Sequence, residues 1–249
     1  LDVLGRINGP EQAARELADI RAELAEETGT FAELFQPGIR TALLVGVVLM
    51  IYQQVNGVNM MLLYGPSILQ NAGIGSASDA IFFTIFLNLF ILVATIIAFG
   101  LVRRYGRRQI LMAGVAGMAA GHLMMAANFF AGGSPLVNLA AMIVAAGSFT
   151  LSIAPVGWVV VSEIYPNRVR ATALAVVCCL LYLASFLCAQ VFPMITALCA
   201  DRMGHPGAAY VFFAAICLSC VVFVWRWLPE TKDLSLESIG RFWLERAGR

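Results

Sequence analysis

Four amide side chains stand within seven residues of an otherwise apolar stretch: Gln53, Gln54, Asn56 and Asn59. A carboxamide both donates and accepts hydrogen bonds, so a group of them suits a ligand that carries many hydroxyl groups. In hydrocarbon such side chains are costly unless they are paired or line a wet cavity. Because Gly57 interrupts the cluster, we interpret it as a binding site in a broken helix rather than as contacts that join two helices.

The other reactive residues do not form a catalytic pattern. The sequence lacks the H-E-x-x-H spacing of zinc peptidases and the G-x-S-x-G turn of serine hydrolases. His122 stands alone in an apolar stretch, which predicts a packed, hydrogen-bonded side chain rather than a base. Cys217 and Cys220 have C-x-x-C spacing but no accompanying histidine or second pair, so we expect buried thiols. We predict no enzyme activity, no metal site and no cofactor.

Long uncharged stretches must hold these side chains. Of the 249 residues, 60% are hydrophobic and 12% are charged, whereas a soluble domain carries about 25% charged residues. A helix that crosses ~30 Å of hydrocarbon needs ~20 apolar residues. The sequence therefore predicts an all-α membrane protein with six transmembrane helices, at about 41–70, 80–101, 109–131, 136–160, 171–198 and 207–226.

Two polar segments flank this bundle of residues 41–226. Residues 1–40 are expected to form a cytoplasmic linker with an amphipathic helix, whose apolar stripe is Leu17, Ile20 and Leu24. Residues 227–249 are expected to form a cytoplasmic tail, with Leu236, Ile239 and Trp243 on one side of a short helix. Because the first residue is leucine rather than methionine, we expect the chain to be part of a longer protein.

Basic residues predict the orientation. Fifteen of the 16 Lys and Arg lie in segments 1–40, 102–108, 162–170 and 226–249, and the opposite loops hold only Arg202. Positive residues accumulate on the cytoplasmic side of membrane proteins, so both termini are predicted to be cytoplasmic. The 15 acidic residues nearly balance the basic ones, which gives no indication of a nucleic-acid partner.

The spans divide into two corresponding groups of three. Gly57 interrupts the first span, and Pro155 and Gly157 are expected to break the fourth. Interruptions at matching places of two halves are typical of inverted repeats that form a site between them. We predict two related three-helix units, 41–131 and 136–226, whose broken helices face a common cavity.

Four motifs occur in order along the chain: QQVNGVN at 53–59, RYGRR at 104–108, PVGWVVVSEIYPNRVR at 155–170 and PETK at 229–232. Together they resemble the sugar porter family of the major facilitator superfamily. The resemblance covers nearly the whole chain but only the second half of a family member. It implies that the six spans are helices 7–12 and that the partner of this bundle is a missing N-terminal six-helix half.

The resemblance also implies roles for individual residues. The sugar-binding amides of the family correspond to Gln53, Gln54 and Asn59, and the aromatic residue that stacks on the sugar corresponds to Trp158. Tyr64 corresponds to a tyrosine that moves when the outer gate closes. An indole ring suits the apolar C–H face of a sugar.

This sequence departs from the family pattern at two site positions. The usual asparagine of helix 8 corresponds to Ile91, while Asn88 stands one turn earlier. A frequent glutamine of helix 11 corresponds to Leu181, and the aromatic residue beside it is retained as Tyr182. Asn88 and Tyr182 are therefore secondary candidates for sugar binding.

At the cytoplasmic edge the family uses charges to close the inner side of the transporter. The corresponding residues are Arg107, Glu163 and Arg170, which are implied to form an ion-pair network. Arginines also favour this edge of a membrane for general reasons.

The function that we predict is half of a secondary transporter. It would move a monosaccharide or a cyclic polyol across the cell membrane by alternating access. The acids of this chain lie only at the ends of spans, so we predict that this half does not carry proton coupling by itself. The resemblance implies that a coupling acid would lie in the N-terminal half. The alternatives are a facilitator for another small neutral or organic solute, or a sensor of the same fold that does not transport.

Overall fold

The computed structural model describes residues 30–71, 76–204, 207–232 and 236–247, together with Gln12 and Leu17. Apart from Leu17, the predicted apolar stripe of the linker lies outside the described residues. Within the described part of the chain, six helical stretches are long and apolar enough to span a membrane, which confirms the predicted number. The elements are η1 (Phe31–Phe35), α3 (Ile39–Val55), α4 (Val58–Leu63), α5 (Gly65–Asn71), α6 (Ala77–Arg104), α7 (Arg107–Phe130), α8 (Pro135–Leu151), α9 (Ile153–Glu163), α10 (Asn167–Met203), α11 (Gly207–Trp227) and α12 (Leu236–Ala247).

The first and fourth spans are each built from two helices, and they are the most buried. The first combines α3 and α4 and the fourth combines α8 and α9; in each, 61% of the most apolar 18-residue stretch is buried inside the bundle. For α6 and α10, the second and fifth spans, that share is 17%. The broken helices therefore form the centre of this bundle, whereas α6 and α10 present apolar side chains outward.

The break in the fourth span lies earlier than the sequence predicted. The helix is interrupted at Ser152, and Pro155 stands in the first turn of α9. Proline has no backbone N–H, and its ring clashes with the carbonyl four residues before it. That carbonyl belongs to Leu151, the last residue of α8, so the chain leaves the helix just after it rather than at Pro155 itself.

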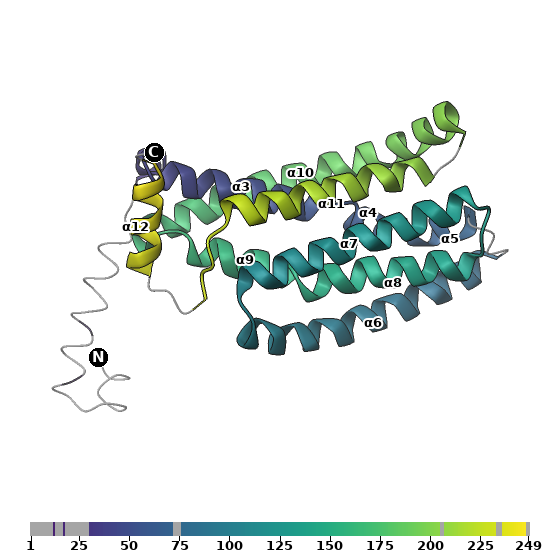
Figure 1. Cartoon of the computed structure of the whole chain (residues 1–249), viewed down its shortest axis with the longest axis horizontal. Coiled ribbons are helices and arrows are strands. Elements are labelled where there is room, and N and C mark those ends of the chain that lie inside the picture. The colour runs from purple at the N-terminus through teal and green to yellow at the C-terminus, as the bar shows by residue number, and fades with distance from the viewer. Residues whose placement is uncertain are drawn as a thin grey trace.

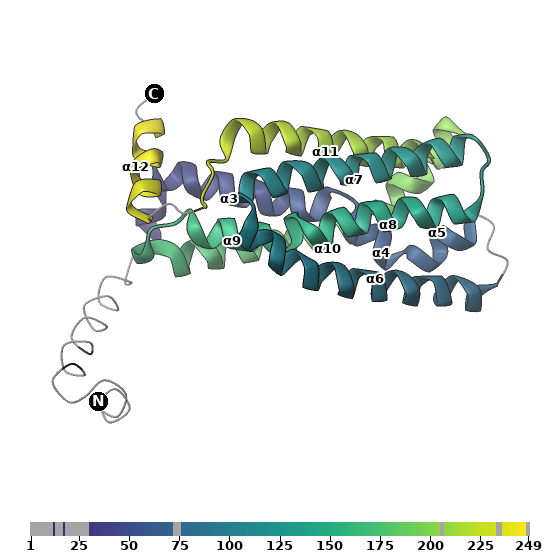
Figure 2. The same cartoon turned by 60° about the horizontal axis from the view of Figure 1, so that its bottom comes forward.

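In chain order the spans fall into two sets of three, and the sets interleave in space: α6 and α7 of the first set pack against α8, whereas α10 and α11 of the second set pack against α3 (Figures 1 and 2). In each unit the first span is broken and central, the second is exposed, and the third, α7 or α11, packs closely against its counterpart. Because three spans bring the chain to the opposite face, the second unit starts upside down relative to the first. That the two sets are related as inverted repeats stays a prediction.

One end of the bundle carries the tail. Figure 1 shows α12 lying across this end, close to where α3 begins and α11 ends. Ile239 and Trp243 are buried there and α12 packs against α3, as predicted for these two residues of the tail helix, while the side chain of Leu236 lies outside the described ones. The junctions between α6 and α7 and between α9 and α10, which carry the predicted basic loops, lie at this same end.

Three glycines let α7 and α8 approach closely. A methyl group added at Gly114 or Gly117 would overlap the side chains of Ser152 and Ser148, respectively. At Gly121 it would lie 2.7 Å from the backbone nitrogen of Ala145. Small residues at such spacing are a common basis for helix packing in membranes.

We expect Gly121→Ala to destabilise the protein by about 1–3 kcal/mol, because the backbone of α8 must move to admit the methyl group. Gly100→Ala is the matched control, since no atom of the described residues lies within 4 Å of a methyl group added there. There the better helix propensity of alanine should stabilise by up to ~1 kcal/mol. Thermal unfolding of both variants in detergent measures the difference, and equal melting temperatures would contradict the predicted contact.

Candidate functional site

The site begins at the break between α3 and α4. Asn56 caps both sides of this break through its own side chain. Its Nδ2 donates to the carbonyls of Tyr52 (2.9 Å) and Gln53 (2.6 Å), and its Oδ1 accepts from the backbone N–H of Val58 (2.8 Å). The next residue, Gly57, has φ of 84°, a left-handed conformation that favours glycine. The backbone groups freed by the break are thus partly satisfied from within the cluster.

The predicted binding amides lie on both sides of this break. Gln54 is in the last turn of α3 and Asn59 is in α4, and Asn59 Nδ2 donates to Gln54 Oε1 at 3.0 Å. Gln54 is 8% exposed, and Asn59 is half-buried. The two side chains therefore form a hydrogen-bonded pair near the middle of the first span.

Gln53 connects the two broken helices. Its Nε2 donates to the carbonyls of Ile153 (3.0 Å) and Ala154 (3.2 Å) at the start of α9. Gly157 lies on the same side of α9, because a methyl group there would be 3.5 Å from Gln53 Nε2. The interruptions of the first and fourth spans are thus in direct contact, as their matching positions predicted.

The other predicted sugar contacts lie on exposed surfaces of this bundle. Trp158, one residue after Gly157, is 37% exposed, and Tyr182 on α10 is 69% exposed. Asn88 is also exposed, and its Nδ2 donates to the Thr84 carbonyl of its own helix at 2.9 Å. The structure brings Gln53, Gln54 and Asn59 together, but it shows no contact between them and Trp158, Asn88 or Tyr182 among the described interactions.

Tyr64, the predicted gate residue, contacts α10. Its hydroxyl donates to the carbonyl of Ala189 at 3.1 Å, and its ring stacks on Phe192 with centroids 5.4 Å apart. Phe192 in turn stacks on Phe213 of α11 at 5.4 Å. Tyr64 therefore joins the part of the first span beyond the break to the two last spans.

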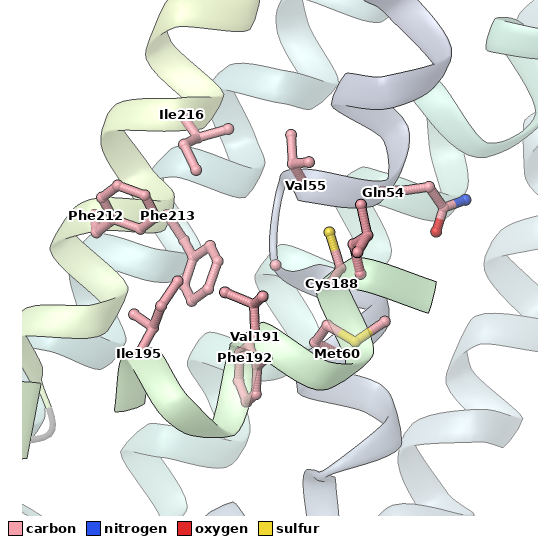
Figure 3. A pocket seen from close by; sticks show the side chains of 12 residues that line it. Gln54, Val55, Met60, Cys188, Val191, Phe192, Ile195, Phe212, Phe213 and Ile216 are labelled. Atoms are coloured by element: carbon pink, nitrogen blue, oxygen red, sulfur yellow. The ribbon is translucent and has the colours of Figure 1, made fainter. Parts of the chain in front are cut away.

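A cavity of about 240 Å³ lies beside the break, where the α3–α4 segment, including Gln54, faces α10 and α11. Its lining is almost wholly apolar and includes Val191, Phe212 and Ile216 (Figure 3). Figure 3 shows the amide group of Gln54 pointing away from these side chains. This cavity lacks the hydrogen-bonding groups that a polyhydroxylated ligand needs, so we do not assign the sugar site to it.

Charged residues meet at the end of the bundle that carries α12. Arg107 Nη2 donates to Glu163 Oε1 at 2.9 Å, and Thr231 Oγ1 donates to Glu163 Oε2 at 2.6 Å. Glu163 thus connects α9, the start of α7 and the segment before α12. The structure pairs Arg107 with Glu163 as the resemblance implied, whereas Arg170 Nη2 donates to the Tyr165 carbonyl at 3.4 Å.

Glu230 is a residue of this cluster that the sequence analysis did not identify. Its carboxylate accepts from the backbone N–H groups of Arg107 (2.8 Å) and Arg108 (3.2 Å), the first residues of α7. A carboxylate at a helix N-terminus is favourable for the unpaired N–H groups and the helix dipole. Gly106 leaves room for it, because a methyl group there would overlap Glu230. In the sequence, the available signal was the PETK motif, which contains Glu230 and lies in one of the basic segments.

Two further groups with shifted pKa values lie at this end, outside the spans. Glu33 pairs with Arg168 at 2.9 Å and joins η1 to the start of α10. The hydrogen bond from the backbone N–H of Thr30 lowers the pKa of Glu33 below its usual range, and Arg168 has a smaller effect in the same direction. Tyr165 packs against Gly46 of α3, and burial raises the pKa of its phenol. The first keeps its charge and the second stays neutral at physiological pH.

His122 and Cys217 lie behind the break. His122 is 1% exposed, and its Nε2 lies 2.8 Å from the carbonyl oxygen of Asn56. Cys217 Sγ is a weaker donor to the same oxygen at 3.8 Å, and Cys220 is also buried. The predicted packed histidine and buried thiols are confirmed.

Comparisons with known proteins give consistent results. A family profile described as "Sugar (and other) transporter" matches residues 2–243. The arabinose-proton symporter of Bacillus subtilis is 34% identical over 251 residues, which cover 98% of this chain and 52% of the symporter. The major myo-inositol transporter of the same organism is 31% identical over 247 residues, 96% of this chain and 51% of the transporter.

A solved structure agrees with these relatives. The proton:xylose symporter XylE of Escherichia coli, bound to 6-bromo-6-deoxy-D-glucose, superposes with a TM-score of 0.79 at 30% identity. The match covers 97% of this chain and 51% of XylE. The chain thus spans about half the length of the curated relatives that it matches.

Proposed function

The chain belongs to the sugar porter family of the major facilitator superfamily, and from this we propose that it is one half of a sugar transporter. The proposed substrate is a monosaccharide or a cyclic polyol. Transport would proceed by alternating access, as this bundle and a second six-helix bundle rock around a site between them. The second bundle, the N-terminal half in the family, is the main protein partner that we propose.

The observation that carries this proposal is the amide pair at the broken centre of the bundle. Gln54 and Asn59 are linked at 3.0 Å where two interrupted spans meet. An amide offers a donor and an acceptor to each sugar hydroxyl. The spans carry no acidic or basic residue near this position, which favours an uncharged ligand over an organic acid.

The same proposal gives roles to the remaining predicted residues. Trp158, Asn88 and Tyr182 lie on surfaces that this bundle leaves exposed. We propose that Trp158 supplies an apolar face to the sugar once the second bundle closes the site, with Asn88 and Tyr182 as further contacts. Tyr64 would act at the outer gate, and Arg107, Glu163 and Arg170 at the inner one.

The basic end of the bundle supports an orientation. The loops with Arg107 and Arg168 lie at the same end as α12, and positive residues accumulate in the cytoplasm. We propose that this end, with both termini, faces the cytoplasm and that the protein resides in the cell membrane. Any proton coupling would rely on the second bundle, because Asp79, Glu163 and Asp201 lie at or near the ends of spans.

Uptake into proteoliposomes tests the proposal. The preparation should contain the whole transporter, with both bundles, and radiolabelled arabinose, D-xylose and myo-inositol should be supplied in parallel. We expect uptake of at least one of them, with competition by unlabelled compound, and no uptake of lactate. Binding without uptake would favour a sensor, and uptake of lactate alone would favour an organic-acid facilitator.

A further inference from the structure

One polar backbone group at the break is not satisfied by the cluster itself. The side chain of Asn56 binds the carbonyls before the break and the N–H after it. The carbonyl oxygen of Asn56, however, accepts from two other helices: from Nε2 of His122 on α7 at 2.8 Å, and more weakly from Sγ of Cys217 on α11 at 3.8 Å. An unpaired buried carbonyl is costly, so the contact with His122 matters for the shape of the break.

The ring of His122 is held firmly in this orientation. It stacks on Tyr210 with centroids 6.3 Å apart and lies 5.9 Å from the ring of Phe213, both on α11. Phe213 also fills the space beside Gly57, where a methyl group would be 2.7 Å from the ring. Because the Asn56 carbonyl can only accept, Nε2 must carry the proton. The other ring nitrogen, Nδ1, has no partner among the described residues.

We propose that His122 is a positioning residue for the sugar site. It does not touch the proposed ligand but acts through the Asn56 carbonyl, which fixes the angle between α3 and α4. That angle sets the distance between Gln54 before the break and Asn59 after it, which are hydrogen-bonded at 3.0 Å. The inference rests on the proposed function only in taking these two amides as ligands of the sugar.

The chain offers variants that separate the hydrogen bond from simple packing. His122→Gln keeps an N–H donor near the position of Nε2, whereas His122→Leu fills similar space without a donor. Asn128→Leu is the matched control, because Asn128 is another buried polar residue of α7. It donates to the Ser134 carbonyl and to Asn138 Oδ1, both at 2.9 Å and remote from the break.

The first measurement is equilibrium binding of radiolabelled D-xylose, arabinose and myo-inositol to the purified whole transporter. We expect His122→Leu to weaken the affinity about 5- to 50-fold, because the buried carbonyl of Asn56 would keep only the weak thiol donor of Cys217 at 3.8 Å. His122→Gln should stay within about 3-fold of wild type, and Asn128→Leu should lower thermal stability without this loss. Equal affinities of the leucine and glutamine variants of His122 would overturn the proposal.

A second measurement does not depend on the ligand. Leu44 on α3 and Leu63 on α4 are both exposed and can carry spin labels, after the cysteines outside the core are replaced by serine. Pulsed electron resonance then reports the distance across the break. His122→Leu should shift or broaden this distance, and His122→Gln should preserve it; an unchanged distance in both overturns the proposal. If wild-type protein binds none of the three compounds, the proposed function fails while this measurement still decides the role of His122.

Discussion

Alanine at Gln54 or at Asn59 is expected to weaken sugar binding by about 5- to 150-fold. Each variant removes a hydrogen-bonding group from a sheltered site, which costs ~1–3 kcal/mol. It also leaves the partner amide unpaired, because the two side chains are linked at 3.0 Å. Equilibrium binding of D-xylose, arabinose and myo-inositol to the whole transporter measures the effect.

Asn138→Ala is the control for this pair. Asn138 is a buried amide in α8 that accepts from Asn128 at 2.9 Å, away from the break. Its loss should affect stability but not affinity. The double variant of Gln54 and Asn59 should lose less than the sum of the two single losses, since the residues share one interaction. Wild-type affinity in both single variants, at normal expression, would refute their assignment to the site.

Glu163→Gln is expected to slow net transport while leaving sugar binding largely intact. Glu163 holds Arg107 at 2.9 Å and Thr231 at 2.6 Å, and both ion-pair side chains are mostly buried. A hydrogen bond to a charged group contributes ~1.5–3 kcal/mol, which corresponds to about a 10- to 150-fold change in a two-state equilibrium. Removing the charge should therefore loosen the inner end and favour the inward-facing state.

The role of Glu163 can be tested by measuring counterflow and sugar binding in proteoliposomes at pH values from about 5.5 to about 8. Glu33→Gln is the matched control, because this carboxylate pairs with an exposed arginine, Arg168, at the same end. Its pair is worth little in water, so transport should stay near wild type. If Glu163→Gln abolished the pH dependence of uptake but preserved exchange, Glu163 would be the coupling group and the inner-gate assignment would be wrong.

Several features of the fold follow from local properties of the sequence. The number of spans could be predicted because each uncharged stretch alone is long enough to cross hydrocarbon. The division into two units was predicted from Gly57 and Pro155, which stand at corresponding places of the first and fourth spans and mark a nearby break in each. The predicted break in the fourth span was wrong by three residues. The proline ring clashes with the carbonyl four residues before it, so the helix is interrupted at Ser152.

The candidate site was partly predictable for the same reason. An amide in hydrocarbon needs a hydrogen-bond partner in any fold. The cluster at 53–59 therefore indicated a site even though the neighbouring helices could not be predicted. Which partner each amide takes was not predictable: Gln53 binds carbonyls of α9 and is thus mainly a link between helices, while Gln54 and Asn59 bind each other.

The remaining contacts join residues that are far apart in the chain. Glu230 reaches the N-terminus of α7, and His122 reaches the carbonyl of Asn56, over separations of 123 and 66 residues. Composition and periodicity report the environment that a residue needs, such as hydrocarbon, water or a hydrogen-bond partner. They do not report which helix supplies that environment, because this depends on how six similar apolar helices pack. The sequence by itself determined the spans and the amide cluster, and only the packing of the helices decided which groups hold the broken helix in shape.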